Sequence, residues 1–278
     1  MNRLNSQERA KIIGCLVEGV SVRATARMLN VDKKTVLRLL AEVGTACKAY
    51  HDSHVFMVQS KRIQCDEIWS FCYAKEKNIP ADMAGVFGVG DVWTWTALCA
   101  DTKLMISYRV DRRDEIAARH FIEDLSKRLA NRVQLTTDGL RAYLVAVPVA
   151  FGKDIDYGML TKLYSAPPKG AGVDSRYSPG ECCGARKSKV IGKPDKAKIS
   201  TSYVERMNLN MRMGMRRFTR LTNAFSKKVE NHTYALAIYF MFYNFGRIHQ
   251  TLRVTPAMEA RLTDHVWSLE EIAGLVDI

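Results

Sequence analysis

The sequence lacks any run of about 18 uncharged apolar residues, the length that a transmembrane helix requires, so we expect no membrane partner. Its first residues do not contain the apolar core of a signal peptide, which predicts a cytoplasmic protein. The hydrophobic fraction of 47% excludes a mostly disordered chain. With 278 residues, the chain is long enough for one sizeable core and a small appended domain.

The chain also lacks the cysteine pattern of a structural zinc site. Its seven cysteines form no Cys-x-x-Cys pair. Cys182 and Cys183 are adjacent, which is a poor geometry for closing a tetrahedral site. We therefore expect reduced thiols that are mostly buried or incidental.

Positive charge is present in excess and is unevenly distributed. The net charge is +13, and residues 181–230 contain 13 Lys and Arg against 4 Asp and Glu. A cationic surface of this density attracts phosphate backbones through counterion release, whatever the base sequence. We predict a nucleic-acid partner; the alternatives are a solvated face that promotes solubility and an acidic protein partner.

Residues 6–44 are predicted to form three short helices. The first ends at Gly19, where the apolar spacing of the helix stops. Ser21 caps the second helix, and Asp32 caps the third, which runs to Leu40.

Within this stretch, the second and third helices match the pattern of a helix-turn-helix. The residues at its characteristic positions are Ala26, Asn30, Val31 and Val36. Asn30 can adopt the left-handed conformation that the turn needs. The side chains expected within reach of a major groove are Lys33, Lys34, Leu37 and Arg38. We predict a DNA-binding domain over residues 1–44 and a linker over residues 45–60; the alternative is an ordinary three-helix domain packed on the rest of the protein.

From residue 61 the pattern predicts a mixed α/β sheet with an antiparallel start, followed by helices. The expected strands are 61–73, 92–100, 104–110, 132–137 and 156–164. The expected helices are 114–129, 140–147 (ending at Pro148), 202–217 and 226–245. Residues 165–200 are predicted to form a long irregular basic loop, and residues 259–278 a C-terminal tail.

Three acidic residues in unlike settings are candidates for a metal site. Asp66 falls in the middle of a predicted strand, where a buried acid costs free energy unless a partner such as a metal pairs with it. The alternative is an exposed edge strand on which Asp66 and Glu67 face water. Alternation lets only one of these two residues point to a given face.

The other two candidates also have ordinary explanations. Asp138 precedes Gly139 at a strand end, where Asp is common as a helix cap and Asp-Gly as a turn. Glu205 follows Ser202 at the spacing of a capping box. The three acids together, in a basic chain, favour a divalent-metal site that acts on a polyanion.

The chemistry explains why acids would lie there. Two Mg²⁺ ions about 3.5–4 Å apart activate an attacking oxygen and stabilise the leaving oxygen of a phosphodiester. Carboxylate oxygens are the ligands that Mg²⁺ prefers, and Mn²⁺ can substitute. We expect Asp66 to bridge both ions, and Asp138 and Glu205 to bind one each.

These residues resemble those of the DDE transposases, which have a ribonuclease-H-like core, and most closely the insertion-sequence-one family of bacterial and archaeal mobile elements. The resemblance covers roughly residues 60–258. In such enzymes the first Asp lies on the first strand, the second Asp follows the fourth strand, and the Glu lies on a later helix. Asp66, Asp138 and Glu205 fill those places. A basic residue two helical turns after the Glu is also usual, and Arg212 stands there.

The more specific signals are Asp66 with Trp69, and the segment Tyr203-Val204-Glu205-Arg206-Met207-Asn208. The run Tyr243-Asn244-x-x-Arg247-x-His249-x-x-Leu252, followed by Thr255-Pro256-Ala257, is similar to the closing motif of many insertion-sequence transposases. Relatives often carry a cysteine-rich zinc finger before the helix-turn-helix, and this sequence has none.

The resemblance implies a Mg²⁺-dependent transposase that cuts at the element's ends and transfers a 3′-hydroxyl strand into target DNA. Its partners would be double-stranded DNA, as terminal inverted repeats and as target, and further copies of the chain in a dimer or larger assembly. The cations expected to hold DNA are Lys33, Lys34, Arg38, Lys187, Lys189, Lys193, Lys196, Lys198, Arg206, Arg212, Arg216, Arg217 and Arg220. The alternatives are a non-catalytic DNA-binding regulator and a nuclease on the same core that joins no strands.

Overall fold

The computed structural model describes residues 4–165, 182–219 and 223–277, and its fold is mixed α/β. A six-stranded sheet lies at the centre, in the order β3-β2-β1-β4-β5-β6. The strands are β1 (Arg62–Cys72), β2 (Gly90–Cys99), β3 (Met105–Asp111), β4 (Gln134–Thr137), β5 (Asp156–Tyr164) and β6 (Cys182–Ile191). The α-helices are α1 (Ser6–Val17), α2 (Val22–Met28), α3 (Lys33–His54), α4 (Glu115–Arg128), α5 (Ala142–Phe151), α6 (Ser202–Gly214), α7 (Val229–Met241), α8 (Pro256–Glu259) and α9 (Leu269–Gly274).

The sheet begins with an antiparallel meander, as the sequence predicted, and becomes parallel in its centre. β1 pairs antiparallel with β2 and parallel with β4. β4 pairs parallel with β5, and β5 pairs antiparallel with β6. β1 is therefore an interior strand, and the alternative that Asp66 lies on an exposed edge strand is wrong.

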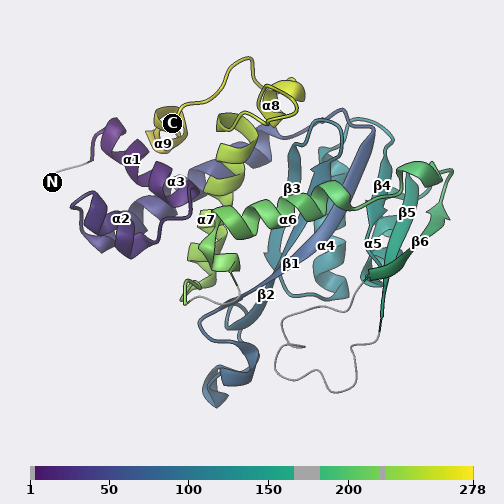
Figure 1. Cartoon of the computed structure of the whole chain (residues 1–278), viewed down its shortest axis with the longest axis horizontal. Coiled ribbons are helices and arrows are strands. Elements are labelled where there is room, and N and C mark those ends of the chain that lie inside the picture. Colours follow the sequence, from purple (N-terminus) through teal and green to yellow (C-terminus); the bar gives the residue numbers. More distant parts are fainter. Residues whose placement is uncertain (1–3, 166–181, 220–222, 278) are drawn as a thin grey trace.

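Helices cover both faces of this sheet (Figure 1). α6 crosses one face and packs on β1 and β2. α4 and α5 pack together on the opposite face. Among the described residues, every helix is too short or too polar to cross a bilayer.

The local signals in the N-terminal helices are confirmed. Gly19 has a φ of 79° and Asn30 a φ of 52°, so both turn residues adopt the left-handed conformation. The side chains of Ser21 and Asp32 accept hydrogen bonds from backbone N–H groups at the starts of α2 and α3.

The third helix is much longer than predicted. It continues from Lys33 to His54 and takes up most of the segment that was expected to be a linker, residues 45–60. The polar run at its end is held by specific partners: an imidazole nitrogen of His51 lies 3.2 Å from the carbonyl oxygen of Met105, and Asp52 accepts from Arg128 at 2.6 Å. These partners stabilise residues that, in sequence, look like helix breakers.

The N-terminal helices share one apolar core with the rest of the chain. α3 packs along α7, and α1 packs against α9. Arg9 also pairs with Asp277 at 2.8 Å, so the predicted C-terminal tail, residues 259–278, contains ordered helices that contact the N-terminal ones. The packing matches the alternative in which the three helices pack on the body of the protein.

Two further boundaries differ from prediction. Pro148 lies inside α5, in its second turn, rather than ending it. The predicted irregular loop, residues 165–200, contains strand β6, which extends the sheet beyond β5, while residues 166–181 lie outside the described part of the chain.

The closing motif of the resemblance supports the β2–β3 hairpin. The buried side chain of Asn244 accepts from the backbone N–H of Met105 and donates to its carbonyl, both at 2.9 Å. The hydroxyl of Tyr243 donates to the carbonyl of Lys103 at 2.9 Å. These contacts satisfy backbone groups at the start of β3, which gives the motif a structural role.

A glycine allows α3 to approach α7 closely. A Cβ atom at Gly44 would lie 2.7 Å from Cα and 2.9 Å from the carbonyl oxygen of Tyr234. We predict that Gly44→Ala lowers the free energy of unfolding by about 1–3 kcal/mol, because backbone atoms cannot move aside as a flexible side chain can. Urea denaturation measures this change.

Gly274→Ala is the matched control, since a Cβ atom there meets nothing within 4 Å. It should leave stability within about 0.5 kcal/mol of the wild type or raise it slightly. Equal effects of the two substitutions would contradict the observed α3–α7 packing.

Candidate metal centre

The site is created by the point at which β4 stops beside β1. The parallel pairing of the two strands ends at Cys65 and Thr137. Asp138 follows Thr137 directly, so it lies beside Asp66 along the edge of β1 that β4 no longer covers. The strand pairing thereby brings together Asp66 and Asp138, which are 72 residues apart in the sequence.

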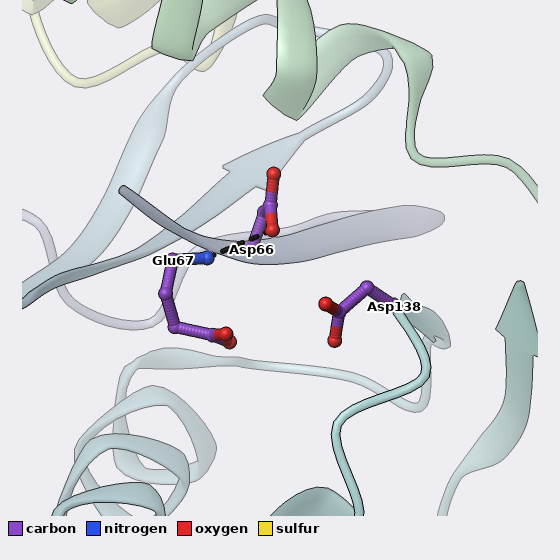
Figure 2. Close-up of side chains that lie close together, drawn as sticks. All are labelled: Asp66, Glu67 and Asp138. Atoms are coloured by element: carbon purple, nitrogen blue, oxygen red, sulfur yellow. Dashed lines mark hydrogen bonds between the residues drawn. The ribbon is translucent and has the colours of Figure 1, made fainter. Parts of the chain in front are cut away.

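Three carboxylates meet at this place (Figure 2). One oxygen from each of Asp66, Glu67 and Asp138 lies within 4.8 Å of the others. Figure 2 shows Asp66 and Glu67 leaving β1 on opposite sides, with Asp138 next to the strand. Because Asp138 sits at the open edge, it can reach acids from both faces of the strand.

Asp66 points toward α6. The side-chain amide of Asn208 donates to its Oδ2 at 2.8 Å, and the backbone N–H of Glu67 donates to its Oδ1 at 2.9 Å. These two donors fix the orientation of the carboxylate, and one of its oxygens lies within 4.8 Å of an oxygen of each other acid.

Glu67 points toward α5 and is the residue that sequence reasoning missed. Its side chain is 1% exposed, accepts a hydrogen bond from the Tyr143 hydroxyl, and lies 3.3 Å from Nε of Arg113. The guanidinium of Arg113 is itself held over the ring of Trp93 at 4.6 Å. Alternation along the strand was predicted correctly, but it did not exclude Glu67 because Asp138 lies between the two faces. The available signal was a second acid next to Asp66 in the middle of a mostly buried strand.

Asp138 forms the predicted turn but caps no helix. Its Oδ1 accepts from the backbone N–H of Leu140 at 2.9 Å, and its Oδ2 lies 3.9 Å from Arg113. α5 starts only at Ala142, after Arg141. The capping explanation for Asp138 is therefore wrong, and its carboxylate faces the cluster.

Glu205 lies beside the three-carboxylate cluster and is not one of its members. It belongs to the first turn of α6, three residues before Asn208, so both side chains lie on the helix face that meets Asp66. Its carboxylate accepts from the Thr201 hydroxyl at 2.6 Å and pairs with Lys162 of β5 at 2.6 Å. The capping box with Ser202 does not form, because the N-cap residue is Thr201.

The acids raise one another's pKa values. Burial, and then the charge of Asp138, raise the pKa of Asp66 to about 7, and Glu205 adds to this effect. Burial, followed by the charges of Asp138 and Asp66, raises the pKa of Glu67 to about 8. Burial and Glu205 also raise the pKa of Asp138. A divalent cation would remove this repulsion, and the all-oxygen donor set fits Mg²⁺ or Mn²⁺.

The predicted DNA-binding cations lie in several parts of the fold. Lys33, Lys34 and Arg38 are at the start of α3 and are exposed. Most of the lysines expected on a loop lie on or just after edge strand β6, where Lys189, Lys193, Lys196 and Lys198 are exposed and Lys187 is half-buried. On α6 and the 3-10 turn Arg216–Phe218, Arg206 and Arg216 are exposed, and Arg212 and Arg217 are half-buried. Arg220 lies outside the described residues.

Most of the cysteines are buried, as predicted. All seven are free thiols, and Cys47, Cys65, Cys72 and Cys99 are buried.

In comparisons with known proteins, no family model and no curated protein matches this chain.

The raised pKa values predict a specific pH dependence of stability. Below about pH 4 the acids are protonated in both the folded and unfolded chain, whose carboxyl groups titrate near pH 4. Between pH 4 and 8 the folded chain retains protons that the unfolded chain has released, so stability falls as pH rises. In EDTA, the loss between pH 5 and 8.5 should be about 4 kcal/mol smaller for Glu67→Gln than for the wild type.

Urea unfolding of both proteins at the two pH values measures this difference. The Tyr143 hydroxyl can still donate to the glutamine carbonyl, so the variant keeps that contact. Parallel pH profiles for the two proteins would mean that Glu67 carries no raised pKa.

Divalent ions should reverse the loss. At pH 8, Mg²⁺ should raise the unfolding temperature of the wild type, because a ligand that binds the folded state stabilises it. Asp138→Asn should abolish most of this response, whereas Asp82→Asn, an exposed acid outside the site, should retain it. Equal responses of these two variants would place the ion elsewhere.

Proposed function

We propose that this chain is a divalent-metal-dependent DNA transposase with a ribonuclease-H-like catalytic core. The observation that carries the proposal is the meeting of Asp66, on an interior strand, with Asp138, at the end of the adjacent parallel strand. Glu205 enters from the helix that crosses the same strand. The strand order β3-β2-β1-β4-β5, antiparallel and then parallel, supports a ribonuclease-H-like core.

In this proposal Asp66, Asp138 and a third acid hold two Mg²⁺ ions. Bound there, the ions would supply activation of the attacking oxygen and stabilisation of the leaving oxygen of a phosphodiester. Asn208 orients Asp66, and Tyr143 and Arg113 orient Glu67. Fixed donors of this kind keep the carboxylates in place before substrate arrives.

The third acid is either Glu67 or Glu205. Glu67 already lies in the cluster, while Glu205 would first exchange its ion pair with Lys162 for a metal ion. Lys162 is 35% exposed and on a long flexible side chain, so it can move away and contact a phosphate instead.

The distribution of cations supports DNA as the substrate. Arg206 is exposed on α6 directly after Glu205, and the exposed lysines on and just after β6 lie toward the far edge of the same sheet. Cations on both sides of the acids would hold the phosphates that flank the reacting one. Recognition of the terminal repeats by the N-terminal helices, and a dimer that brings two DNA ends together, complete the proposal.

The test uses a labelled duplex with the sequence that flanks this reading frame, a plasmid target and Mg²⁺. The wild type should cut the labelled strand at the end and join it to the plasmid. Asp66→Asn should reduce both steps by at least about a thousandfold, because it removes the carboxylate expected to bind both Mg²⁺ ions. Binding of the duplex in EDTA should change less than about twofold, since the carboxylate contacts no phosphate without the ions.

Asp82→Asn serves as the control, because this exposed acid lies outside the site. Cutting by Asp66→Asn at the wild-type rate would disprove the mechanism. Cutting without joining would identify a nuclease, and metal-independent binding without any cutting would identify a DNA-binding regulator.

A further inference from the structure

A pocket lies between the N-terminal helices and the segment that joins α6 to α7. Its volume is about 750 Å³, within the range of pockets that hold drug-sized ligands. One wall comes from the turn between α1 and α2 and from α3. The other comes from the 3-10 turn Arg216–Phe218, residues 223–227 and α7.

The described lining is cationic and contains no acidic residue. Its cations are Arg23, Lys33, Arg216, Arg217 and Lys227. Five positive charges around one hollow repel one another unless an anion enters. The lining therefore favours a ligand that carries negative charge.

The surroundings of Arg217 indicate that this anion is a bound ligand rather than an acidic side chain of the protein. It is half-buried and donates to the hydroxyl of Ser226, and no described Asp or Glu forms an ion pair with it. Burial lowers the pKa of Arg217 to about 10. A desolvated guanidinium without a carboxylate is costly, and a phosphate would supply the missing charge in bidentate geometry.

The remaining lining is apolar or neutral. Leu37, Ile238 and the ring of Phe225 face the same hollow as the cations. The ring of Phe225 packs against Phe71, with 4.7 Å between ring centroids, and Nζ of Lys227 lies over it at 5.0 Å. A base that stacks on this ring would take the place of the Lys227 side chain. Asn223 adds a side chain that can both donate and accept hydrogen bonds. The lining therefore fits a ligand that carries a phosphate and a partly apolar group.

Duplex DNA does not fit such a hollow. In the usual helix-turn-helix arrangement, residues at the start of the recognition helix enter a major groove. Here Lys33 and Leu37 face residues 215–217, 223–227 and α7 across the pocket, so the hollow itself has no room for a duplex. Lys34 and Arg38 do not line the pocket and are exposed, so they stay open to a duplex outside it.

We propose that this pocket binds a single unpaired nucleotide, with its phosphate at Arg217 and Arg216 and its base against Phe225 and Leu37. The source is a DNA strand end that is not base-paired. This choice rests on the proposed function, whereas the nucleotide chemistry rests on the pocket. Free nucleotides share this chemistry and are an arm of the test.

The pocket is separate from the acid cluster. Residues 223–228 contact the end of β1, where the N–H of Tyr73 donates to the carbonyl of Ser226 at 2.8 Å. Cys72 lies six positions after Asp66 along the strand, which corresponds to about 20 Å. Substitutions in the pocket therefore leave the carboxylates intact.

The experiment measures binding in EDTA to two labelled hairpin duplexes, one blunt and one with a short 5′-phosphorylated single-stranded overhang. The wild type should prefer the overhang by about tenfold, the effect of one well-held base. Arg217→Gln, Phe225→Leu and the exposed Arg216→Gln should each remove most of this preference. Arg216→Gln is included because Arg216 is exposed, so this substitution should not disturb folding even if substitution of the half-buried Arg217 does. Lys11→Gln, an exposed cation of α1 outside the pocket, should retain the preference.

Deoxyadenosine monophosphate is the competitor that identifies the source. Displacement of the overhang only at far higher concentrations supports a DNA strand end, and displacement at equal concentrations supports a free nucleotide in the same site. Equal wild-type affinity for both duplexes, or pocket variants that weaken both duplexes alike, would overturn the proposal.

The outcome is independent of catalysis. Strand joining with Mg²⁺ but without a preference for the overhang would contradict the pocket proposal and leave the proposed activity standing. A preference for the overhang without any cutting of DNA would contradict the proposed activity and leave the pocket proposal standing.

Discussion

The parallel pairing of β1 with β4 is the constraint on which the candidate site depends. It ends at Cys65 and Thr137, one residue before an acid on each strand. A pairing shifted by one residue would turn Asp66 and Glu67 to the opposite faces and move Asp138 along the strand edge. The apolar residues of β1 that face the two helical layers oppose such a shift, so the core of the sheet fixes the geometry of the acids.

The same arrangement explains why the acids depend on their surroundings. Three carboxylates within 4.8 Å in a mostly buried place repel one another, and their pKa values rise. The protein offsets part of this cost with neutral donors, Asn208 and Tyr143, and with one partly exposed arginine, Arg113. A fully paired cluster would be more stable but would have little affinity for a cation. The incomplete neutralisation is what makes the site suitable for a metal ion.

Much of the fold follows from local sequence signals. The strands β1 to β5 and helix α4 lie close to their predicted positions because alternation, hairpin residues and the Asp114 cap act over short distances. The extension of α3 could not be predicted in the same way. His51 and Asp52 are stabilised by Met105 and Arg128, which are more than 50 residues away in sequence. Glu67 was missed for the same reason, since its neighbours Tyr143 and Asp138 come from later elements.

Under the two proposals above, Glu205 and the pocket cations illustrate one physical point about a basic protein that binds a polyanion. Lys162 pairs with Glu205, where a phosphate and metal ions would otherwise compete for the two side chains. Arg217 has the Ser226 hydroxyl as a partner and no described carboxylate. An ion pair that must open for a ligand has to be weak, and a side chain 35% exposed to water provides that. A cation that waits for a ligand can instead remain unpaired, provided that the walls around it keep its position. Lys162 and Arg217 therefore represent two ways in which one fold can reserve charge for the same class of ligand.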